Sequence, residues 1–355
     1  MAGDRPGRRG GQAARDRRPA DDGAQAEPAV ARALPHLHGH AGRGDGRDQR
    51  AAPDGSRRLP RRPRGLLALE GRVVRVSFWG VRGSVPVADR AALGYGGNTS
   101  CVAVRLRDGS RLVLDAGTGI RDLGLALAGV RDEIHILLTH LHLDHIMGLL
   151  FFAPLFDPQS RVTVWGPPDP SVGLRRRLAR YLSAPLSPIE IRELPAQMEF
   201  RMVPSESFRL GSAEIEAALV NHRGPTLGYR VTDGDAVLAY IPDHEPALGQ
   251  NLERDAPEWI SGWALACTAS LLIHDAQYTA EEYEGTRGWG HSTVHDALAF
   301  ARRVEAERVA LFHHDPTHDD ARLDAIAAEA AQAWSARAGD ASAVFVSRER
   351  DVLEL

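Results

Sequence analysis

A run of ionisable residues inside an apolar segment, LLTHLHLDHIMGLL at residues 137–150, constrains this chain more than any other feature. Three histidines and one aspartate fall within six positions, at His140, His142, Asp144 and His145. A buried imidazole or carboxylate is costly unless it has a partner. Imidazole nitrogen and carboxylate oxygen are ligands that suit zinc and other divalent first-row metals. The run therefore predicts a metal-binding turn.

The local structure of this run is predicted to be a strand that ends at Thr139, then a turn, then a helix. Alternation along the turn is expected to point the ionisable residues one way while Leu141 and Leu143 pack inward. A single histidine in such a place is most often a core residue with a hydrogen-bond partner. Four ligand-type residues at this spacing favour a metal site instead.

The composition describes a globular protein. With 355 residues, 43% of them hydrophobic, the chain can bury a sizeable core in one large domain or two. No run approaches the roughly 20 apolar residues of a membrane span, and no signal-type apolar segment is present, so we expect a cytoplasmic protein. The two cysteines, Cys101 and Cys267, are too few for a disulfide framework or a thiolate metal site.

Residues 1–72 differ in composition from the rest of the chain. They are rich in arginine, glycine, proline and alanine, with 16 arginines against 9 acidic residues, whereas the remainder has 27 against 38. Such a segment cannot bury enough apolar surface to offset the entropy of ordering it. We expect a disordered extension at residues 1–72 and a folded domain at residues 73–355. A basic arm that contacts nucleic acid or a membrane is the alternative.

Short β-rich runs recur from the segment VVRVSFWG at residue 73 onward, and most end in Gly, Pro, Asn or Asp. Further strands are predicted over residues 101–106, 112–114, 134–138, 162–165, 214–220, 227–231, 237–241, 271–273, 309–312 and 343–346. Helical patterns follow Ser292 and cover about residues 319–336. Many strands with a few helices favour two packed sheets with helices outside.

The H-x-H-x-D-H turn resembles the signature of the metallo-β-lactamase superfamily, and the likeness extends over roughly residues 73–355. It implies an α/β fold of four layers, an αββα sandwich. That family places its later metal ligands singly at strand ends. Ligand-type residues occur there in this chain, at His222, Asp243 and His313. His314 is the alternative to His313, which is favoured because it directly follows the apolar strand.

The resemblance implies a dinuclear site with two divalent metal ions, Zn2+ or Mn2+. One ion would be held by His140, His142 and His222, the other by Asp144, His145 and His313, and Asp243 would bridge them. Two such ions share a water, lower its pKa towards neutrality, and hold substrate oxygens. Their positive charge would also offer an anionic substrate a favourable site within an acidic domain.

The segment LLIHDAQYTAEEYEGTRGWGHST, at residues 271–293, resembles two motifs of the ribonuclease Z branch. In that branch a histidine of GHST is oriented by an acidic residue of an earlier HEAT segment. The resemblance implies that His291 is a general acid or a phosphate contact and that Asp275 fixes its tautomer. This chain has Asp in place of Glu and AQYT in place of AT. A helix N-cap at Ser292 or Thr293 is the structural alternative for GHST.

The segments SFWGVRGSVPV and YGGNTSCVAV, from Ser77 and Tyr95, resemble the phosphodiesterase-like branch, including relatives of phosphoribosyl cyclic phosphodiesterase. The long Gly-rich and basic arm of ribonuclease Z is missing from residues 73–355, and the arginine run GLRRRLARYL at residues 173–182 predicts a solvated helix face. The resemblance therefore implies a small or cyclic phosphodiester as substrate rather than folded RNA. No membrane partner is expected, and a homodimer is compatible with the sequence.

Two other functions remain open from the sequence. One is a thioester or lactone hydrolase with the same metals. The other is an RNA-interaction protein whose metal site is structural and whose arginine-rich tail contacts the RNA. Retained RNA affinity after chelation of the metal would favour the second.

Deletion of residues 1–70 is expected to leave the thermal midpoint and the turnover of small substrates nearly unchanged. The reason is that the segment lacks core-forming residues and that every proposed ligand follows it. Thermal unfolding and rate measurements on the truncated chain check this. A large loss in either quantity would show that the segment packs on the domain.

Overall fold

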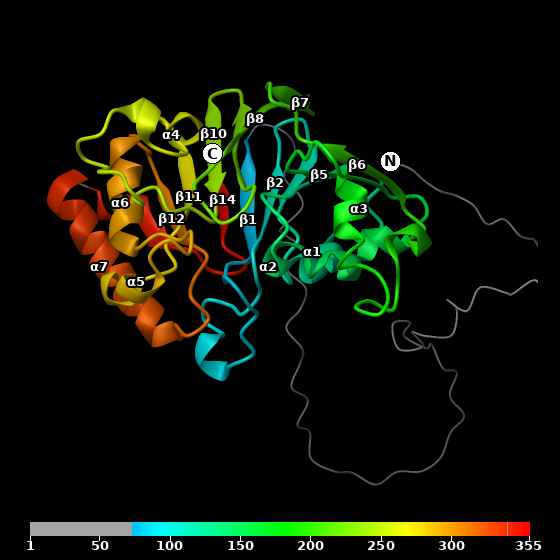
Figure 1. Ribbon diagram of the computed structural model, residues 1–355, viewed down its shortest axis with the longest axis horizontal. Helices are drawn as coiled ribbons and strands as arrows, with labels where there is room; N and C mark the ends of the chain where they lie inside the picture. Colours follow the sequence, from blue (N-terminus) through cyan, green and yellow to red (C-terminus); the bar gives the residue numbers. More distant parts are fainter. Residues whose placement is uncertain (1–72, 339) are drawn as a thin grey trace, which may run out of the picture. The chain divides into compact units, whose positions relative to one another are not determined.

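Two mixed β-sheets of seven strands each form the core of the described residues, 73–338 and 340–355 of the computed structural model (Figure 1). The first sheet has the order β14-β1-β2-β3-β4-β5-β6, with β1 (Arg75–Gly80), β2 (Cys101–Arg105), β3 (Arg111–Leu114), β4 (Ile134–Leu137), β5 (Arg161–Gly166), β6 (Gln197–Met202) and β14 (Val352–Glu354). The second has the order β13-β12-β11-β10-β9-β8-β7, with β7 (Phe208–Leu210), β8 (Ala213–Leu219), β9 (Leu227–Asp233), β10 (Ala236–Ile241), β11 (Leu271–Asp275), β12 (Val309–Phe312) and β13 (Val344–Val346). The predicted extension at residues 1–72 lies outside the described residues.

Each sheet has an antiparallel part and a parallel part. In the first sheet the pairs from β14 to β3 are antiparallel and the pairs from β3 to β6 are parallel. In the second sheet the pairs from β7 to β10 are antiparallel and the pairs from β10 to β13 are parallel. The carboxyl ends of neighbouring parallel strands share one edge, where open α/β sheets place their ligands. Residues that follow these strands can therefore meet.

The predicted strands are confirmed, and each boundary agrees within two residues. Three further strands, β6, β7 and β14, were not predicted. The residues of β6 are half-buried or exposed throughout, and β7 and β14 have three residues each. All three lie at sheet edges, where one side of the strand faces solvent and the apolar pattern is weak.

Short helices accompany the first sheet and longer ones the second. The α-helices are α1 (Ile120–Ala126), α2 (Leu143–Ile146), α3 (Leu174–Leu178), α4 (Trp263–Ala266), α5 (Ala280–Thr286), α6 (Val294–Arg303) and α7 (Asp320–Ala338). The 3-10 helices are η2 (Arg90–Ala92), η3 (Leu149–Phe151), η4 (Ala153–Phe156), η5 (Ile191–Glu193), η6 (Pro257–Trp259) and η7 (Ala341–Ala343). Helices are found where the sequence predicts them: α2 after the turn that begins at His140, α3 at the arginine run, α6 after Ser292, and α7. None of the described helices is long and apolar enough to cross a membrane.

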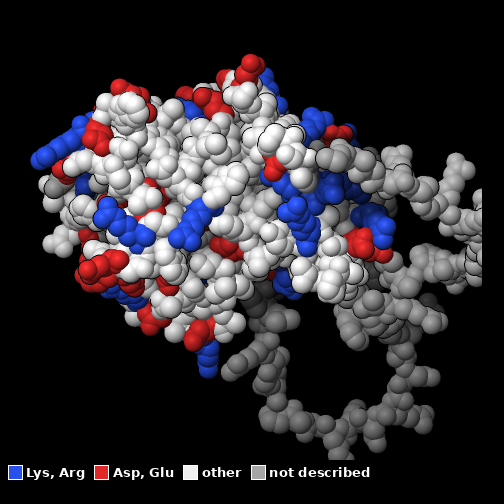
Figure 2. All heavy atoms as spheres, viewed as in Figure 1, with Lys and Arg blue, Asp and Glu red and all other residues white. Residues whose placement is uncertain are grey.

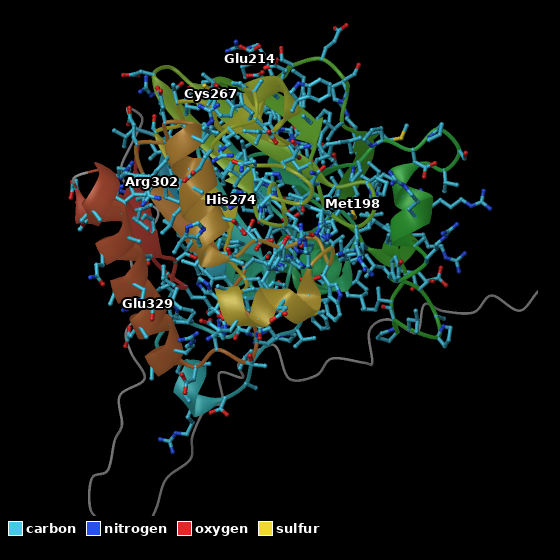
Figure 3. All side chains as sticks on the ribbon, turned by 60° about the vertical axis from the view of Figure 1, so that its left-hand side comes forward. Met198, Glu214, Cys267, His274, Arg302 and Glu329 are labelled. Carbon is cyan, nitrogen blue, oxygen red and sulfur yellow. The ribbon has the colours of Figure 1, made fainter. Side chains whose placement is uncertain are left out.

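Three apolar cores separate the layers. The core between the sheets contains Phe78, Tyr240 and Phe312, with Phe312 6.2 Å from Phe78 and 5.9 Å from Tyr240 between ring centroids. On the second sheet, α6 and α7 lie side by side and bury Leu298 and Ile326 (Figure 3). A third core lies between α1, α3 and the first sheet. The predicted αββα sandwich is confirmed.

The arginine run forms the outer face of α3. Leu174 and Leu178 are buried, whereas Arg175 and Arg176 are exposed. In Figure 2, arginine side chains gather in the region where Figure 1 places α3. The helix is therefore amphipathic, with the solvated arginine face that the sequence predicts.

Replacement of Phe78 by alanine is expected to lower the free energy of unfolding by about 3–5 kcal/mol, because it empties a fully buried aromatic position between the sheets. Leu93, which is 70% exposed, provides the control, and Leu93→Ala should change the same quantity by less than about 0.5 kcal/mol. Urea denaturation measures both. Equal effects would contradict the assignment of the inter-sheet core.

Candidate metal centre

The structure brings the seven predicted ligands together at the carboxyl edge of the parallel strands. They come from the segments that follow β4, β8, β10 and β12 and from α2: His140 and His142, His222, Asp243, His313, and Asp144 with His145. Both sheets therefore contribute to the site. Two groups of ligand atoms form, and Asp243 touches both.

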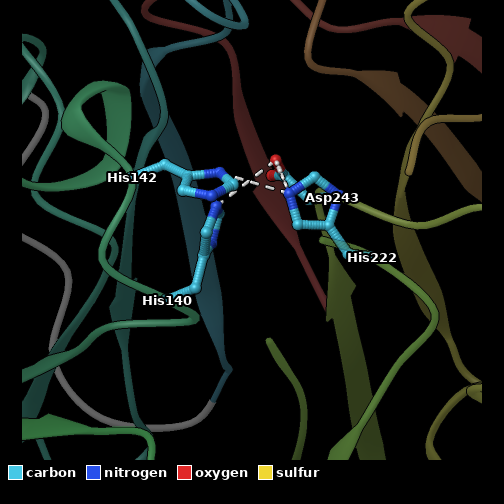
Figure 4. A group of neighbouring side chains, drawn as sticks. All are labelled: His140, His142, His222 and Asp243. Carbon is cyan, nitrogen blue, oxygen red and sulfur yellow. Dashed lines mark hydrogen bonds and ion pairs between the residues drawn. The ribbon is translucent and has the colours of Figure 1, made fainter. Parts of the chain in front are cut away.

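The first group consists of His140, His142, His222 and Asp243, whose ligand atoms all lie within 4.8 Å of one another (Figure 4). His222 Nε2 lies 3.3 Å from His142 Nδ1. Asp243 Oδ2 lies 3.7 Å from His140 Nε2 and 3.6 Å from His222 Nε2. Ligands about 2.0–2.1 Å from a tetrahedral zinc ion lie roughly 3.3–3.4 Å from each other. The spacing of these side chains is close to that value.

The second group consists of Asp144, His145 and His313. His313 Nε2 lies 3.2 Å from Asp144 Oδ2 and 3.3 Å from His145 Nε2. Asp243 Oδ1 lies 3.0 Å from His145 Nε2 and 3.5 Å from His313 Nε2. One oxygen of Asp243 therefore faces each group.

Buried atoms without hydrogen-bond partners mark the centre of the site. His140 Nε2 and Asp243 Oδ1 are buried and make no hydrogen bond among the described residues. Their nearest polar groups are ion-pair contacts, 3.7 Å from His140 Nε2 to Asp243 Oδ2 and 3.0 Å from Asp243 Oδ1 to His145 Nε2. Such orphaned polar atoms are rare in folded proteins and call for a missing ligand. Imidazole nitrogens and carboxylate oxygens that converge in this way fit a divalent metal ion.

The charges around His145 favour a cation. Burial lowers the pKa of the His145 imidazole, yet the carboxylates of Asp243, Asp144 and Asp115 together raise this pKa well above its ordinary value. Burial raises the pKa of the Asp243 carboxyl, but the surrounding histidines hold it well below its usual range. The same negative field that would keep a proton on His145 attracts a metal ion.

Outward-facing contacts orient the ligand histidines. The second ring nitrogen, Nδ1, has a protein partner in four of them: Thr139 Oγ1 at 3.0 Å for His140, Asp115 Oδ2 at 2.8 Å for His145, Gly290 O at 2.7 Å for His222 and Gln277 Oε1 at 2.9 Å for His313. Each contact leaves Nε2 as the nitrogen that faces the centre. His142 instead presents Nδ1 to His222.

Asp115 is a site residue that the sequence reasoning missed. It directly follows β3 and is fully buried. Its carboxylate contacts His145 and also accepts hydrogen bonds from the Thr139 backbone N–H at 2.7 Å and from the Tyr240 hydroxyl at 3.0 Å. Its φ of +60° is in the left-handed region, which non-glycine residues adopt infrequently. An acidic residue directly after an apolar strand, LVLD, was the available signal.

The predicted partners His291 and Asp275 are in contact. His291 Nδ1 lies 2.7 Å from Asp275 Oδ2, and Asp275 is fully buried. Burial lowers the pKa of His291, but the charge of Asp275 and this hydrogen bond raise it to about 9. The His291 ring lies 4.9 Å between centroids from both His222 and His313. The N-cap alternative also holds, because Thr293 Oγ1 caps α6.

His313, rather than His314, faces the ligand groups. His314 Nε2 donates a hydrogen bond to the Ser347 carbonyl at 2.9 Å, and burial lowers the pKa of His314 to about 3.

The expectation that Leu143 packs inward is wrong, because its side chain is 53% exposed. Strand-like alternation ends where α2 begins, and Leu143 is the first residue of that helix. Leu141 does pack partly against the outer core of the first sheet.

A cavity of about 440 Å³ opens beside the ligands. Its polar wall comprises Ser84, His142, Asp144, Asp243 and His291, and its apolar wall comprises Leu141, Leu143 and Tyr181. The Ser84 backbone N–H donates to Asp144 Oδ2 at 2.8 Å, so the loop after β1 also braces the site. Its volume is in the range of pockets that hold small molecules.

Known proteins resemble this chain in sequence and in fold. A family model for the Beta-lactamase superfamily domain matches residues 110–314, more than half of the chain. A ribonuclease Z of Haloferax volcanii is 25% identical over 282 residues, which cover 68% of this chain and 84% of the relative. Among solved structures, the metallo-beta-lactamase fold protein YhfI from Bacillus subtilis has a TM-score of 0.58 at 17% identity and covers 80% of this chain and 99% of its own. A diphosphatase from the PhnP family has a TM-score of 0.56 at 18% identity and covers 79% and 98%. The chain therefore belongs to the beta-lactamase superfamily, and ribonuclease Z is among its relatives.

Proposed function

We propose that this chain is a metal-dependent hydrolase that cleaves small or cyclic phosphodiesters. The observation that carries the proposal is the His291–Asp275 pair, placed beside the ligand histidines at the wall of the cavity. An alkoxide that leaves a phosphodiester needs a proton, whereas the thiolate that leaves a thioester needs none. The name of the Haloferax relative, ribonuclease Z, supports the same class of bond.

The ligand groups would hold two divalent ions, Zn2+ or Mn2+. His140, His142 and His222 would hold one, Asp144, His145 and His313 the other, and Asp243 would contact both. Bound there, the ions would polarise a phosphoryl oxygen and lower the pKa of water towards neutrality. The protein's part is to turn each imidazole so that Nε2 faces the ions, which the contacts of Asp115 with His145 and of Gln277 with His313 do.

His291 would supply the proton for the leaving group. Asp275 binds Nδ1–H, which leaves Nε2 as the free nitrogen of a ring that lines the cavity. With a pKa of about 9, the imidazole carries a proton on each nitrogen at neutral pH, and cations in the site would move this pKa down towards the working range. The proton on Nε2 passes to the departing oxygen, and Asp275 keeps the ring in its tautomer.

Cleavage of RNA is a second candidate, because the Haloferax relative is named for it. The cavity of about 440 Å³ and its short apolar wall favour a small substrate. Rates on a cyclic nucleotide and on a transfer RNA with a 3′ extension, measured side by side, separate the two. Faster cleavage of the RNA would contradict the proposed small substrate, whereas the proposal of a metal-dependent phosphodiesterase would stand.

Purified protein is expected to contain about two divalent ions per chain, and Asp243→Ala and His142→Ala are expected to abolish hydrolysis of a bis-aryl phosphodiester without unfolding the chain. Each change removes a ligand from the centre. His295, whose side chain is 77% exposed, gives the control variant His295→Ala, which should keep metals and activity. Elemental analysis, circular dichroism and rates are the measurements. A metal-free preparation with full activity would overturn the proposal.

His291→Ala is expected to keep both metals yet lose roughly 10²- to 10⁴-fold in rate on a diester with a poor alkoxide leaving group. Nitrophenolate departs without a proton, so the loss on an aryl diester should be much smaller. Steady-state rates on the two substrates, with metal content measured in parallel, test this. Equal losses would indicate that His291 binds phosphate or orders the site, and loss of a metal would make it a ligand, since it also lies within reach of Asp243 and His313.

A further inference from the structure

Glu245 is a buried carboxylate that the proposed chemistry does not use. It lies two residues after Asp243 and is 1% exposed. Its Oε1 accepts hydrogen bonds from the Gly288 backbone N–H at 2.8 Å and the Tyr283 hydroxyl at 2.6 Å. Its Oε2 accepts from the Gly290 backbone N–H at 2.8 Å. A carboxylate has acceptors only, so these three donors replace the water that burial removed.

The two glycines bound by Glu245 belong to the segment that carries His291. Gly288 has a φ of +82° and Gly290 a φ of +96°, both in the left-handed region that glycine adopts without strain. The Gly290 carbonyl contacts His222 Nδ1 at 2.7 Å, and a Cβ added to Gly290 would come within 2.4 Å of the same nitrogen. The backbone of this segment is therefore packed directly against a ligand histidine, and the next residue is His291.

We propose that Glu245 is a positioning residue that holds residues 288–290 in place for two purposes. Through Gly290 it fixes the ring of His222, and through the same peptide it sets the position of His291 at the cavity. The part that concerns His291 rests on the proposed function. The part that concerns His222 depends only on the ligand geometry.

The residues next to Glu245 connect it to the surroundings of both histidines. Asp243 leaves β10 and points into the ligand groups, and the His244 backbone N–H donates to Asp275 Oδ2 at 3.0 Å. The Glu245 backbone N–H donates to the Asn221 carbonyl at 2.8 Å, which ties the segment to the residue before His222. Three consecutive residues thus contact the metal centre, the partner of His291 and the glycine segment.

The variant Glu245→Gln tests the proposal with little change in shape. Its amide has one acceptor oxygen, so its NH2 group must face the N–H of Gly288 or Gly290, and one of the two contacts is lost. We expect faster amide hydrogen exchange in the peptide that spans residues 287–291 and roughly 10- to 100-fold weaker retention of metal, the usual effect of losing an outer partner of a ligand. On diesters we expect a larger loss of rate for an alkoxide than for an aryl leaving group.

Two matched variants separate positioning from general stability. Glu349→Gln makes the same chemical change at a carboxylate that accepts from the Asn98 backbone N–H at 2.6 Å, away from the ligands, and should keep wild-type metal affinity. Tyr283→Phe removes only the hydroxyl contact of Glu245 and should keep slow exchange at residues 287–291. Wild-type exchange and wild-type metal affinity in Glu245→Gln would overturn the proposal.

The exchange and metal measurements stand apart from the proposed function. If the wild-type protein cleaves no phosphodiester, the function fails while these two readouts still decide the role of Glu245. If the wild-type protein is active and Glu245→Gln shows equal losses on alkoxide and aryl diesters, the part of the inference that concerns His291 is wrong.

Discussion

The contact on which the rest of the site depends is the carboxylate of Asp243, because each of its oxygens faces a different group of ligands. Oδ1 lies 3.0 Å from His145 Nε2 and Oδ2 lies 3.6 Å from His222 Nε2. The residue follows β10, the strand that is antiparallel to β9 and parallel to β11. The parallel strands β10, β11 and β12 have their carboxyl ends at one edge, and ligands of α/β sheets bind outside such an edge. The topology thus places one carboxylate between ligand-type side chains from both sheets.

A cluster of buried imidazoles and carboxylates costs free energy when no cation is bound, so contacts with the surrounding protein must hold these side chains in place. Asp115 and Gln277 do so by binding the outward nitrogens of His145 and His313. Glu245 acts one layer further out, on the backbone that contacts His222. Such contacts hold ligands in place before a metal binds, which limits the entropy lost on binding.

The sequence predicted well which side chains the fold brings together at this edge, and the reason is local. The residues His140 to His145 have a spacing typical of a metal-binding turn, His313 directly follows the apolar strand β12, and Asp243 comes two residues after β10. The outer partners could not be predicted in the same way. Asp115 lies 30 residues from His145, and Glu245 lies 45 residues from Gly290, so these contacts exist only in the folded chain. The error at Leu143 has a local cause. The alternating side-chain directions of a strand were assumed for this residue, but Leu143 is the first residue of helix α2, where side chains point in other directions.

Anomalous diffraction at the zinc edge, from crystals of the metal-loaded protein, tests the central claim most directly. We expect two peaks, one among His140, His142 and His222 and the other among Asp144, His145 and His313, with the Asp243 carboxylate between them. A single peak, or peaks held by other side chains while these residues keep their present contacts, would contradict it.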